Sequence, residues 1–183
     1  MTKEERIQRS NSILEEFNNT ELTCDRMKPN RVGDWFLDGP PMNLIRAPEN
    51  VYFMGKAPGE LETQYHAIEE CRKRGGKVLT TGLGIGMFVD YVLLNDNVES
   101  ITVIEKYQEV IDLVAPYLKD RWGDRLIIIK ADALEYVPDQ RYTVIWHDIW
   151  ANQFAAENTA DCRKIKEVYA PYCDWQGFWQ THG

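Results

Sequence analysis

Three glycines alternate with apolar residues in the stretch Gly82-Leu83-Gly84-Ile85-Gly86, which follows an apolar run that begins at Lys77. Glycine reaches backbone conformations that are closed to other residues, and the backbone of such a turn can lie against a ligand near the free N–H groups of the next helix. A side chain at these positions is expected to fill the space of the ligand. The pattern predicts a strand, a turn that binds a phosphate or a nucleoside, and a helix; a tight turn without a ligand is the alternative.

The glycine spacing and a distant carboxylate narrow the choice of ligand. The dinucleotide pattern G-x-G-x-x-G needs a third glycine at Met87 or Val89, and neither residue is glycine. Glu105, which lies 23 residues after Gly82, ends a second apolar run. A doubly wound sheet places a carboxylate there to accept both hydroxyls of a ribose, although an ordinary solvated strand end is the alternative.

Two further carboxylates follow apolar runs that are typical of strands. Asp132 comes after residues 126–129, and Asp148 comes after residues 143–146. A carboxylate at the end of a buried strand costs free energy unless a ligand, a cation or a hydrogen-bond donor meets it, so Asp148 is the best candidate for chemistry. Asp132 is also a common type of turn or helix-cap residue. His147 could act as a general base; because side chains alternate along a strand it should point to the opposite face from Asp148, and a packing role there is the alternative.

The segments around these residues must hold them at one edge of a sheet. Apolar residues recur at helical spacing in residues 60–74, and further helices are expected at 87–94 and at 107–115, where Pro116 should bend or finish the last one. A continuous apolar run such as 126–129 is typical of a parallel strand that is buried on both faces. The alternation predicts an α/β doubly wound fold with ligands at the carboxyl ends of the strands.

The N-terminal part lies outside this alternation. Residues 43–46 and 50–54 are candidate strands of a hairpin. Residues 2–19 predict a docking or dimerising helix, and a homodimer would be one use of it. Its apolar side is expected to carry Ile7, Ile13, Leu14 and Phe17.

The C-terminal part is short for a complete domain of this type. After Asp148 there is room for a helix at 161–169 and for a tail that holds Trp175, Phe178 and Trp179. Such large aromatic groups bury too much apolar area to remain in water. They are expected either to replace the missing edge of the sheet or to close the substrate pocket.

Composition limits the partners and the location. The chain has 183 residues, which suits one domain, and its net charge of −8 argues against binding to nucleic acid. The four cysteines lie far apart without a C-x-x-C motif, so we expect reduced thiols and no metal site. No apolar stretch approaches the ~18 residues of a membrane span, so we expect a cytoplasmic protein without membrane contact.

Residues 51–150 resemble the class I S-adenosylmethionine-dependent methyltransferases and, within them, the spermidine-synthase-like branch. Methyltransferases usually place an acidic residue two positions before the first glycine; that place is Thr80 here, and spermidine-synthase-like proteins lack the acid too. Residues 60–66 look like the aminopropyltransferase segment D-E-x-x-Y-H-E. The other features that carry the resemblance are the turn at Gly82, Gly84 and Gly86, the strand end at Glu105, the pair Asp132-Ala133, and residues 142–148.

The resemblance implies a fold and a cofactor. It implies a shortened Rossmann-like parallel sheet of the class I methyltransferase type, with helices on both faces and an N-terminal helix and β-hairpin. We divide this single globular domain into an extension (1–58), a cofactor-binding core (59–150) and a C-terminal helix with its aromatic tail (151–183). The expected cofactor is S-adenosylmethionine or S-adenosylhomocysteine. The residues expected to hold it are Gly82, Gly84, Gly86, Glu105, Lys106, Asp132, Ala133 and Gln64.

The same resemblance gives Asp148 a catalytic role. Aminopropyltransferases have an aspartate at the matching place, which orients and deprotonates the attacking amine. Their Ser-Ser-Asp-Pro-like run after it is replaced here by Ile149-Trp150-Ala151-Asn152. We therefore expect methyl transfer to a small acceptor. Aminopropyl transfer from decarboxylated S-adenosylmethionine, or a non-catalytic protein that binds S-adenosylmethionine or serves in assembly, are the alternatives.

Further contacts with the acceptor are expected from four residues. They are His66, His147, Trp150 and Trp175. The whole chain also resembles small phage and prophage proteins that share residues 147–150 and end in residues 174–177, but this likeness does not supply a function.

Overall fold

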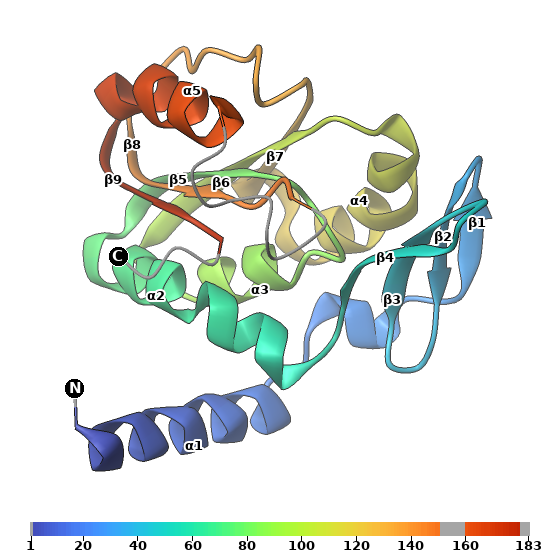
Figure 1. The fold of residues 1–183 in the computed structure, drawn as a ribbon, viewed down its shortest axis with the longest axis horizontal. Coiled ribbons are helices and arrows are strands. Elements are labelled where there is room, and N and C mark those ends of the chain that lie inside the picture. The colour runs from blue at the N-terminus through green and yellow to red at the C-terminus, as the bar shows by residue number, and fades with distance from the viewer. Residues whose placement is uncertain (1, 151–159, 180–183) are drawn as a thin grey trace.

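The computed structural model describes residues 2–150 and 160–179 (Figure 1). The helices in this part of the chain are α1 (Lys3–Asn19), α2 (Pro58–Arg74), α3 (Met87–Leu93), α4 (Gln108–Trp122) and α5 (Ala160–Tyr169). The strands are β1 (Asn30–Val32), β2 (Trp35–Asp38), β3 (Asn43–Arg46), β4 (Val51–Gly55), β5 (Gly76–Thr81), β6 (Val98–Glu105), β7 (Leu126–Lys130), β8 (Tyr142–His147) and β9 (Cys173–Phe178).

Five of these strands form a parallel sheet in the order β7-β6-β5-β8-β9. Because side chains alternate along a strand, Val78 and Val144 pack in one cluster with α2, α3 and α4, whereas Leu79 and Ile145 pack in another with α5. In Figure 1, α5 lies on one side of this sheet, and α2 and α3 lie on the other. The predicted α/β fold with helices on both faces of a parallel sheet is confirmed.

The order of the strands positions a ligand site. From β5 the chain moves outward through β6 to β7, and then returns to the other side of β5 to form β8 and β9. The direction of winding therefore reverses between β5 and β8. In open α/β sheets, ligands bind outside the carboxyl ends of the strands at such a point.

The aromatic tail forms strand β9 at the edge of the parallel sheet. Trp175 pairs with Val144 and Phe178 pairs with His147 in the register with β8. After the strand, the indole N–H of Trp179 donates to the hydroxyl of Thr63 at 3.1 Å. The tail therefore replaces the missing edge of the sheet, which was one of the two predicted alternatives.

The N-terminal extension contains more sheet than the predicted hairpin. The pair β3–β4 is that hairpin, and β1 and β2 extend it to four antiparallel strands in consecutive order. Trp35 and Leu37 on β2 are each 2% exposed, because this strand packs close to α4. The sheet thereby lies next to the carboxyl end of β6, from which α4 begins.

Helix α4 excludes one of two predicted alternatives. The helix was expected to bend or finish at Pro116, and it does not finish there but continues to Trp122 with the proline inside it. A proline removes one backbone hydrogen bond from a helix. The buried residues Val114 and Leu118 lie on both sides of Pro116, so their packing holds the helix together across the missing bond.

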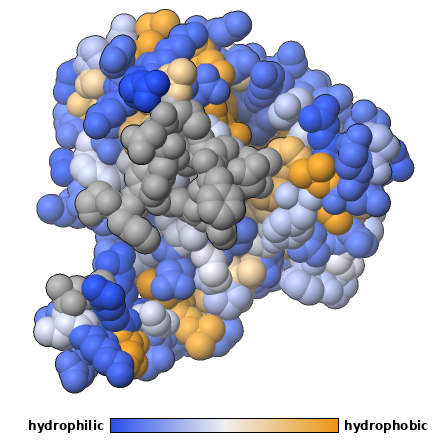
Figure 2. Space-filling model, viewed as in Figure 1, coloured by the Kyte–Doolittle hydropathy of each residue, from blue (hydrophilic) through white to orange (hydrophobic). Residues whose placement is uncertain are grey.

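Helix α1 presents only part of its apolar side to the core. Of the four apolar residues, Ile13 is buried and Phe17 is half-buried, whereas Ile7 is 51% and Leu14 is 44% exposed. Figure 2 shows a mostly hydrophilic surface with separate apolar spots around this helix. No helix within residues 2–150 and 160–179 is long and apolar enough to span a membrane.

Candidate functional site

The glycine turn connects β5 to α3 with three residues in left-handed conformations. The φ angles of Gly82, Gly84 and Gly86 are +92°, +53° and +81°, values that side chains disfavour. A Cβ atom on Gly82 would overlap the carbonyl oxygen of Asp148, and one on Gly86 would lie 2.7 Å from Leu118. Glycine is therefore needed at these two positions because a side chain would clash with protein atoms. The sequence prediction had given a different reason, that a side chain would occupy the space of the ligand.

Glu105 ends β6 beside this turn. Its carboxylate accepts the backbone N–H of Leu83 at 2.9 Å and the backbone N–H of Tyr107 at 2.8 Å. Burial raises its pKa, although these two hydrogen bonds favour the charged form. Each carboxylate oxygen can accept a further hydrogen bond, so the side chain can hold the turn and a ligand hydroxyl at the same time.

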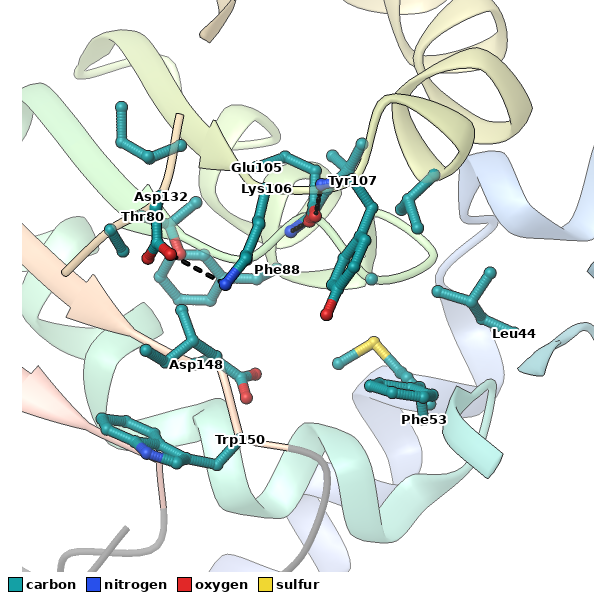
Figure 3. Close-up of a pocket in the computed structure, with 18 of the residues that line it drawn as sticks. Leu44, Phe53, Thr80, Phe88, Glu105, Lys106, Tyr107, Asp132, Asp148 and Trp150 are labelled. Carbon is teal, nitrogen blue, oxygen red and sulfur yellow. Dashed lines mark hydrogen bonds and ion pairs between the residues drawn. The ribbon is translucent and has the colours of Figure 1, made fainter. Parts of the chain in front are cut away.

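Lys106 and Asp132 form an ion pair at the ends of the neighbouring strands. The Lys106 Nζ lies 2.8 Å from Asp132 Oδ2, and the other carboxylate oxygen accepts the backbone N–H of Leu134 at 3.0 Å (Figure 3). The hydrogen bond from Lys106 lowers the pKa of Asp132. Next to it, the carbonyl of Ala133 accepts the hydroxyl of Tyr169 at 3.0 Å. This ion pair and hydrogen bond fix the backbone after β7.

Asp148 follows β8 and faces α2. The Gln64 Nε2 lies 3.4 Å from Asp148 Oδ2, a long hydrogen bond. Burial, and to a smaller extent the negative charge of Glu60, raise the pKa of Asp148 to about 7. The side chain of Gln64 is fully buried, and its Oε1 has no hydrogen-bond partner among the described residues. The carboxyl end of β8 therefore holds a carboxyl group that titrates near neutral pH, beside an unsatisfied carbonyl.

These groups surround one cavity of about 270 Å³. The carboxyl ends of the parallel strands contribute its polar side, which includes Glu105, Asp132 and Asp148. The N-terminal sheet and α4 contribute an apolar side. Figure 3 shows the carboxylate of Asp148 on one side of the open space, with Phe53 and Tyr107 across it. The cavity thus joins a polar end to an apolar end.

Most of the predicted site residues line this cavity. They are Gln64, Gly82, Gly84, Glu105, Lys106, Asp132, Ala133, Asp148 and Trp150. Gly86, His66, His147 and Trp175 are not among the lining residues. His66 is exposed, and its ring makes an edge contact with the ring of Trp175, with the two ring centroids 5.4 Å apart.

His147 is a packing residue, as the alternation along the strand predicted. Its ring is fully buried, and the centroids of the Tyr169 and Phe178 rings each lie 4.8 Å away. Its Nδ1 lies 3.2 Å from the hydroxyl oxygen of Thr81. Burial lowers the pKa of His147 to about 3. The imidazole is therefore neutral near pH 7 and has no access to the cavity.

Sequence reasoning missed the residues that the N-terminal sheet brings to the cavity. They are Trp35, Leu44, Phe53 and Met54. The available signal was the aromatic residues among the prolines and glycines of residues 28–58, but their position depends on how this sheet packs against the core. The described residues contain no group of three or more His, Cys, Asp or Glu side chains that could hold a metal ion.

Comparisons with known proteins show the fold of the chain. No protein-family model and no curated protein matches it. A structure of spermidine synthase in complex with the transition state analogue AdoDATO has a TM-score of 0.56 and 18% identity, and the match covers 80% of this chain and 54% of that one. The N-methyltransferase NodS from Bradyrhizobium japonicum WM9 has a TM-score of 0.52 and 16% identity, and the match covers 66% of this chain and 67% of that one. The chain spans about half the length of the spermidine synthase, and it has the Rossmann-like fold of the methyltransferases.

Proposed function

We propose that this protein binds S-adenosylmethionine and transfers its methyl group to a small acceptor. The observation that carries the proposal is the position of Glu105. Its carboxylate lines the cavity at the end of β6 and also holds the glycine turn after β5 through Leu83. A carboxylate at this place can accept both hydroxyls of a ribose, and the missing third glycine disfavours a dinucleotide.

The groups around the cavity fit the parts of this cofactor. Glu105 would hold the ribose, while Asp132 and Ala133 would hold the adenine. The turn at Gly82 and Gly84 would receive the amino-acid part, and the unsatisfied carbonyl of Gln64 is left for an ammonium group of either the cofactor or the acceptor. That carbonyl is buried and lacks a donor, and an ammonium group is a donor without an acceptor function.

Asp148 is the proposed catalytic residue. The cofactor supplies a methyl group on a positively charged sulfur, which leaves the protein to align the acceptor and to take up its proton. Because its pKa is raised to about 7, Asp148 is both ionised in part at neutral pH and basic enough to accept a proton. The net charge of −8 supports a small acceptor over a nucleic acid.

Aminopropyl transfer is the second candidate. It is supported by the match to spermidine synthase, which extends over 80% of this chain. A non-catalytic role is less well supported, because a cavity is retained next to Asp148. Trp175 of the aromatic tail, however, is not among the residues that line that cavity, so this residue gives no support for catalysis.

Calorimetric titration of the purified protein tests the proposal. S-Adenosylmethionine, S-adenosylhomocysteine and decarboxylated S-adenosylmethionine are titrated separately, and bound ligand that co-purifies is identified by mass spectrometry. We expect the first two to bind. Binding of the decarboxylated compound about tenfold tighter than both would support aminopropyl transfer instead. Binding of none of the three would refute the proposed cofactor.

A further inference from the structure

Asp148 lies at the β8 end of the cavity, and the cation among the described lining residues, Lys106, is ion-paired with Asp132. Asp148 and Glu60 form no ion pair with any residue in the described part of the chain, and the charge of Glu60 acts on Asp148. Two neighbouring carboxyl groups of like charge destabilise each other's charged form. A cationic ligand beside Asp148 would remove this conflict.

Gln64 supplies an independent sign of the same ligand. It lines the cavity, is fully buried, and directs its amide nitrogen to Asp148 at 3.4 Å. Its Oε1 is left without a donor among the described residues. An unsatisfied buried carbonyl is costly, so a donor is expected to meet it in the complex. A hydroxyl group has one proton to donate, whereas an ammonium group has three and can serve both Gln64 and Asp148.

The opposite side of the cavity does not suit a second cation. The N-terminal sheet lines it with Trp35, Leu44, Phe53 and Met54, none of which carries a charge. Beyond them lies a positive charge, because the guanidinium of Arg46 is 5.6 Å from the ring centroid of Trp35 and 5.4 Å from that of Tyr107. A diamine that spans the cavity would therefore place its second ammonium near the guanidinium of Arg46, which already lies over the Trp35 and Tyr107 rings, and the two like charges would repel each other.

We propose that the acceptor is a monoamine with an apolar, ring-sized body. Its nitrogen lies between Asp148 and the Gln64 carbonyl, and its body packs against Phe53 and Met54. This inference rests on the proposed function, which assigns the Glu105 and Asp132 part of the cavity to the nucleoside. It goes beyond that function because it selects a class of acceptor and makes the N-terminal sheet the element that determines specificity.

Calorimetry with three matched probes tests this inference at about pH 8, where an Asp148 with the raised pKa is ionised. The probes are 2-phenylethylamine, 2-phenylethanol, which lacks the ammonium group, and 1,4-diaminobutane, which lacks the ring. Each is titrated into protein saturated with S-adenosylhomocysteine. We expect 2-phenylethylamine to bind at least about tenfold tighter than either of the others. Equal or tighter binding of 1,4-diaminobutane would overturn the inference.

A further titration of 2-phenylethylamine into the free protein, followed by S-adenosylhomocysteine, separates two sources of the ammonium group. If 2-phenylethylamine binds the free protein but is displaced by S-adenosylhomocysteine, the site holds the amino group of the cofactor, and the inference about the acceptor is wrong. If S-adenosylhomocysteine itself fails to bind, the proposed function fails instead. Binding of both together supports the inference.

Variants assign the contacts. Asp148→Asn should weaken binding of 2-phenylethylamine by at least about tenfold and leave that of 2-phenylethanol unchanged, because only the charge is removed. Phe53→Ala should weaken both, and Phe53→Leu replaces it if the alanine variant does not fold. Glu62→Gln is the matched control, since Glu62 is an exposed carboxylate on the same helix as Gln64. An Asp148→Asn variant that is folded and binds the amine normally would contradict the inference.

Discussion

The carboxylate of Glu105 accepts a hydrogen bond from the backbone N–H of Leu83 at 2.9 Å, and so connects the end of β6 to the glycine turn after β5. Both residues line the cavity. The side chain that is expected to bind the ribose therefore also shapes the backbone against which the cofactor would lie. Binding and stability should be coupled at this residue.

Replacement of Glu105 by alanine should affect both properties. The variant leaves the buried N–H of Leu83 without its partner, which should lower the free energy of unfolding by about 1–3 kcal/mol. It should also weaken the binding of S-adenosylhomocysteine by about 1–3 kcal/mol, the scale for loss of hydrogen bonds to a charged group. Urea denaturation and calorimetry measure the two effects.

Glu99→Ala is the control for this experiment, because Glu99 lies on the same strand with an exposed side chain. It should change neither quantity appreciably. A folded Glu105→Ala protein with unchanged ligand affinity would remove Glu105 from the binding site.

Two glycines of the turn, Gly82 and Gly84, should respond differently to alanine. At Gly82 the new Cβ would meet the backbone carbonyl of Asp148, which cannot move without shifting β8, whereas at Gly84 it would lie 2.5 Å from the sulfur of Met54 at the end of a flexible side chain. We expect Gly82→Ala to destabilise the protein by about 3 kcal/mol or more, and Gly84→Ala to cost less. Thermal melts monitored by circular dichroism show which of the two variants has the lower melting temperature.

Gly59→Ala is the matched control for the glycine series. Gly59 lies in the first turn of α2, and apart from its chain neighbours and the adjacent backbone of its own helix, no described atom lies within 4 Å of the position that its Cβ would take. This variant should be neutral or slightly stabilising, because alanine favours a helix over glycine by about 1 kcal/mol. Equal losses at Gly59 and Gly82 would contradict the explanation from close packing.

The convergence of the polar residues could be predicted from the sequence for a simple reason. Glu105, Asp132 and Asp148 each end an apolar run, and the carboxyl ends of parallel strands lie along the same edge of a sheet. The opposite orientation of His147 also followed from the two-residue period of a strand. These features depend only on local pattern and on the rule for parallel sheets.

The apolar side of the cavity could not be predicted because it depends on tertiary packing. Strand β2 has only four residues, and Trp35 reaches the cavity because the N-terminal sheet folds back on α4. The effect of Glu60 on Asp148 likewise joins residues that are distant in the sequence. The end of α4 at Trp122 instead of at Pro116 depends on packing too, because that packing outweighs the loss of one hydrogen bond.

Ligands should stabilise the protein selectively. S-Adenosylmethionine or S-adenosylhomocysteine should raise the melting temperature, because a ligand that binds only the folded state shifts unfolding by mass action. NAD should not do so, since Met87 and Val89 stand where a dinucleotide site needs glycine. Differential scanning fluorimetry at matched ligand concentrations makes the comparison. Stabilisation by NAD alone would overturn the cofactor assignment.

The raised pKa of Asp148 predicts opposite effects of pH on stability and on activity. The native state holds this proton up to about pH 7, whereas an unfolded aspartate loses it near about pH 4. Between these values the native state binds more protons than the unfolded state, so the contribution of Asp148 to the free energy of unfolding falls as the pH rises. The ionised form is the base, so kcat/KM should rise to a plateau above about pH 7.

Pairs of pH profiles, one for stability and one for kcat/KM, check this prediction. The inflection near pH 7 should disappear from both profiles in Asp148→Asn, because asparagine does not titrate. A wild-type activity profile that is flat between about pH 5 and 9 would show that no group with this pKa takes part in turnover.

Asp148→Asn should separate cofactor binding from catalysis. Asparagine keeps the shape of the side chain and an oxygen that can accept the amide of Gln64, but it removes the charge that would take up a proton. Turnover should fall by about 100-fold or more, the usual contribution of a general base, while the affinity for S-adenosylhomocysteine stays within a few-fold. Steady-state kinetics and calorimetry on the same preparation measure both, with Glu62→Gln as the control for loss of one nearby carboxylate. If the affinity falls in proportion to turnover, Asp148 is a cofactor ligand or a structural group, and if turnover is unchanged, the proton must go to another residue.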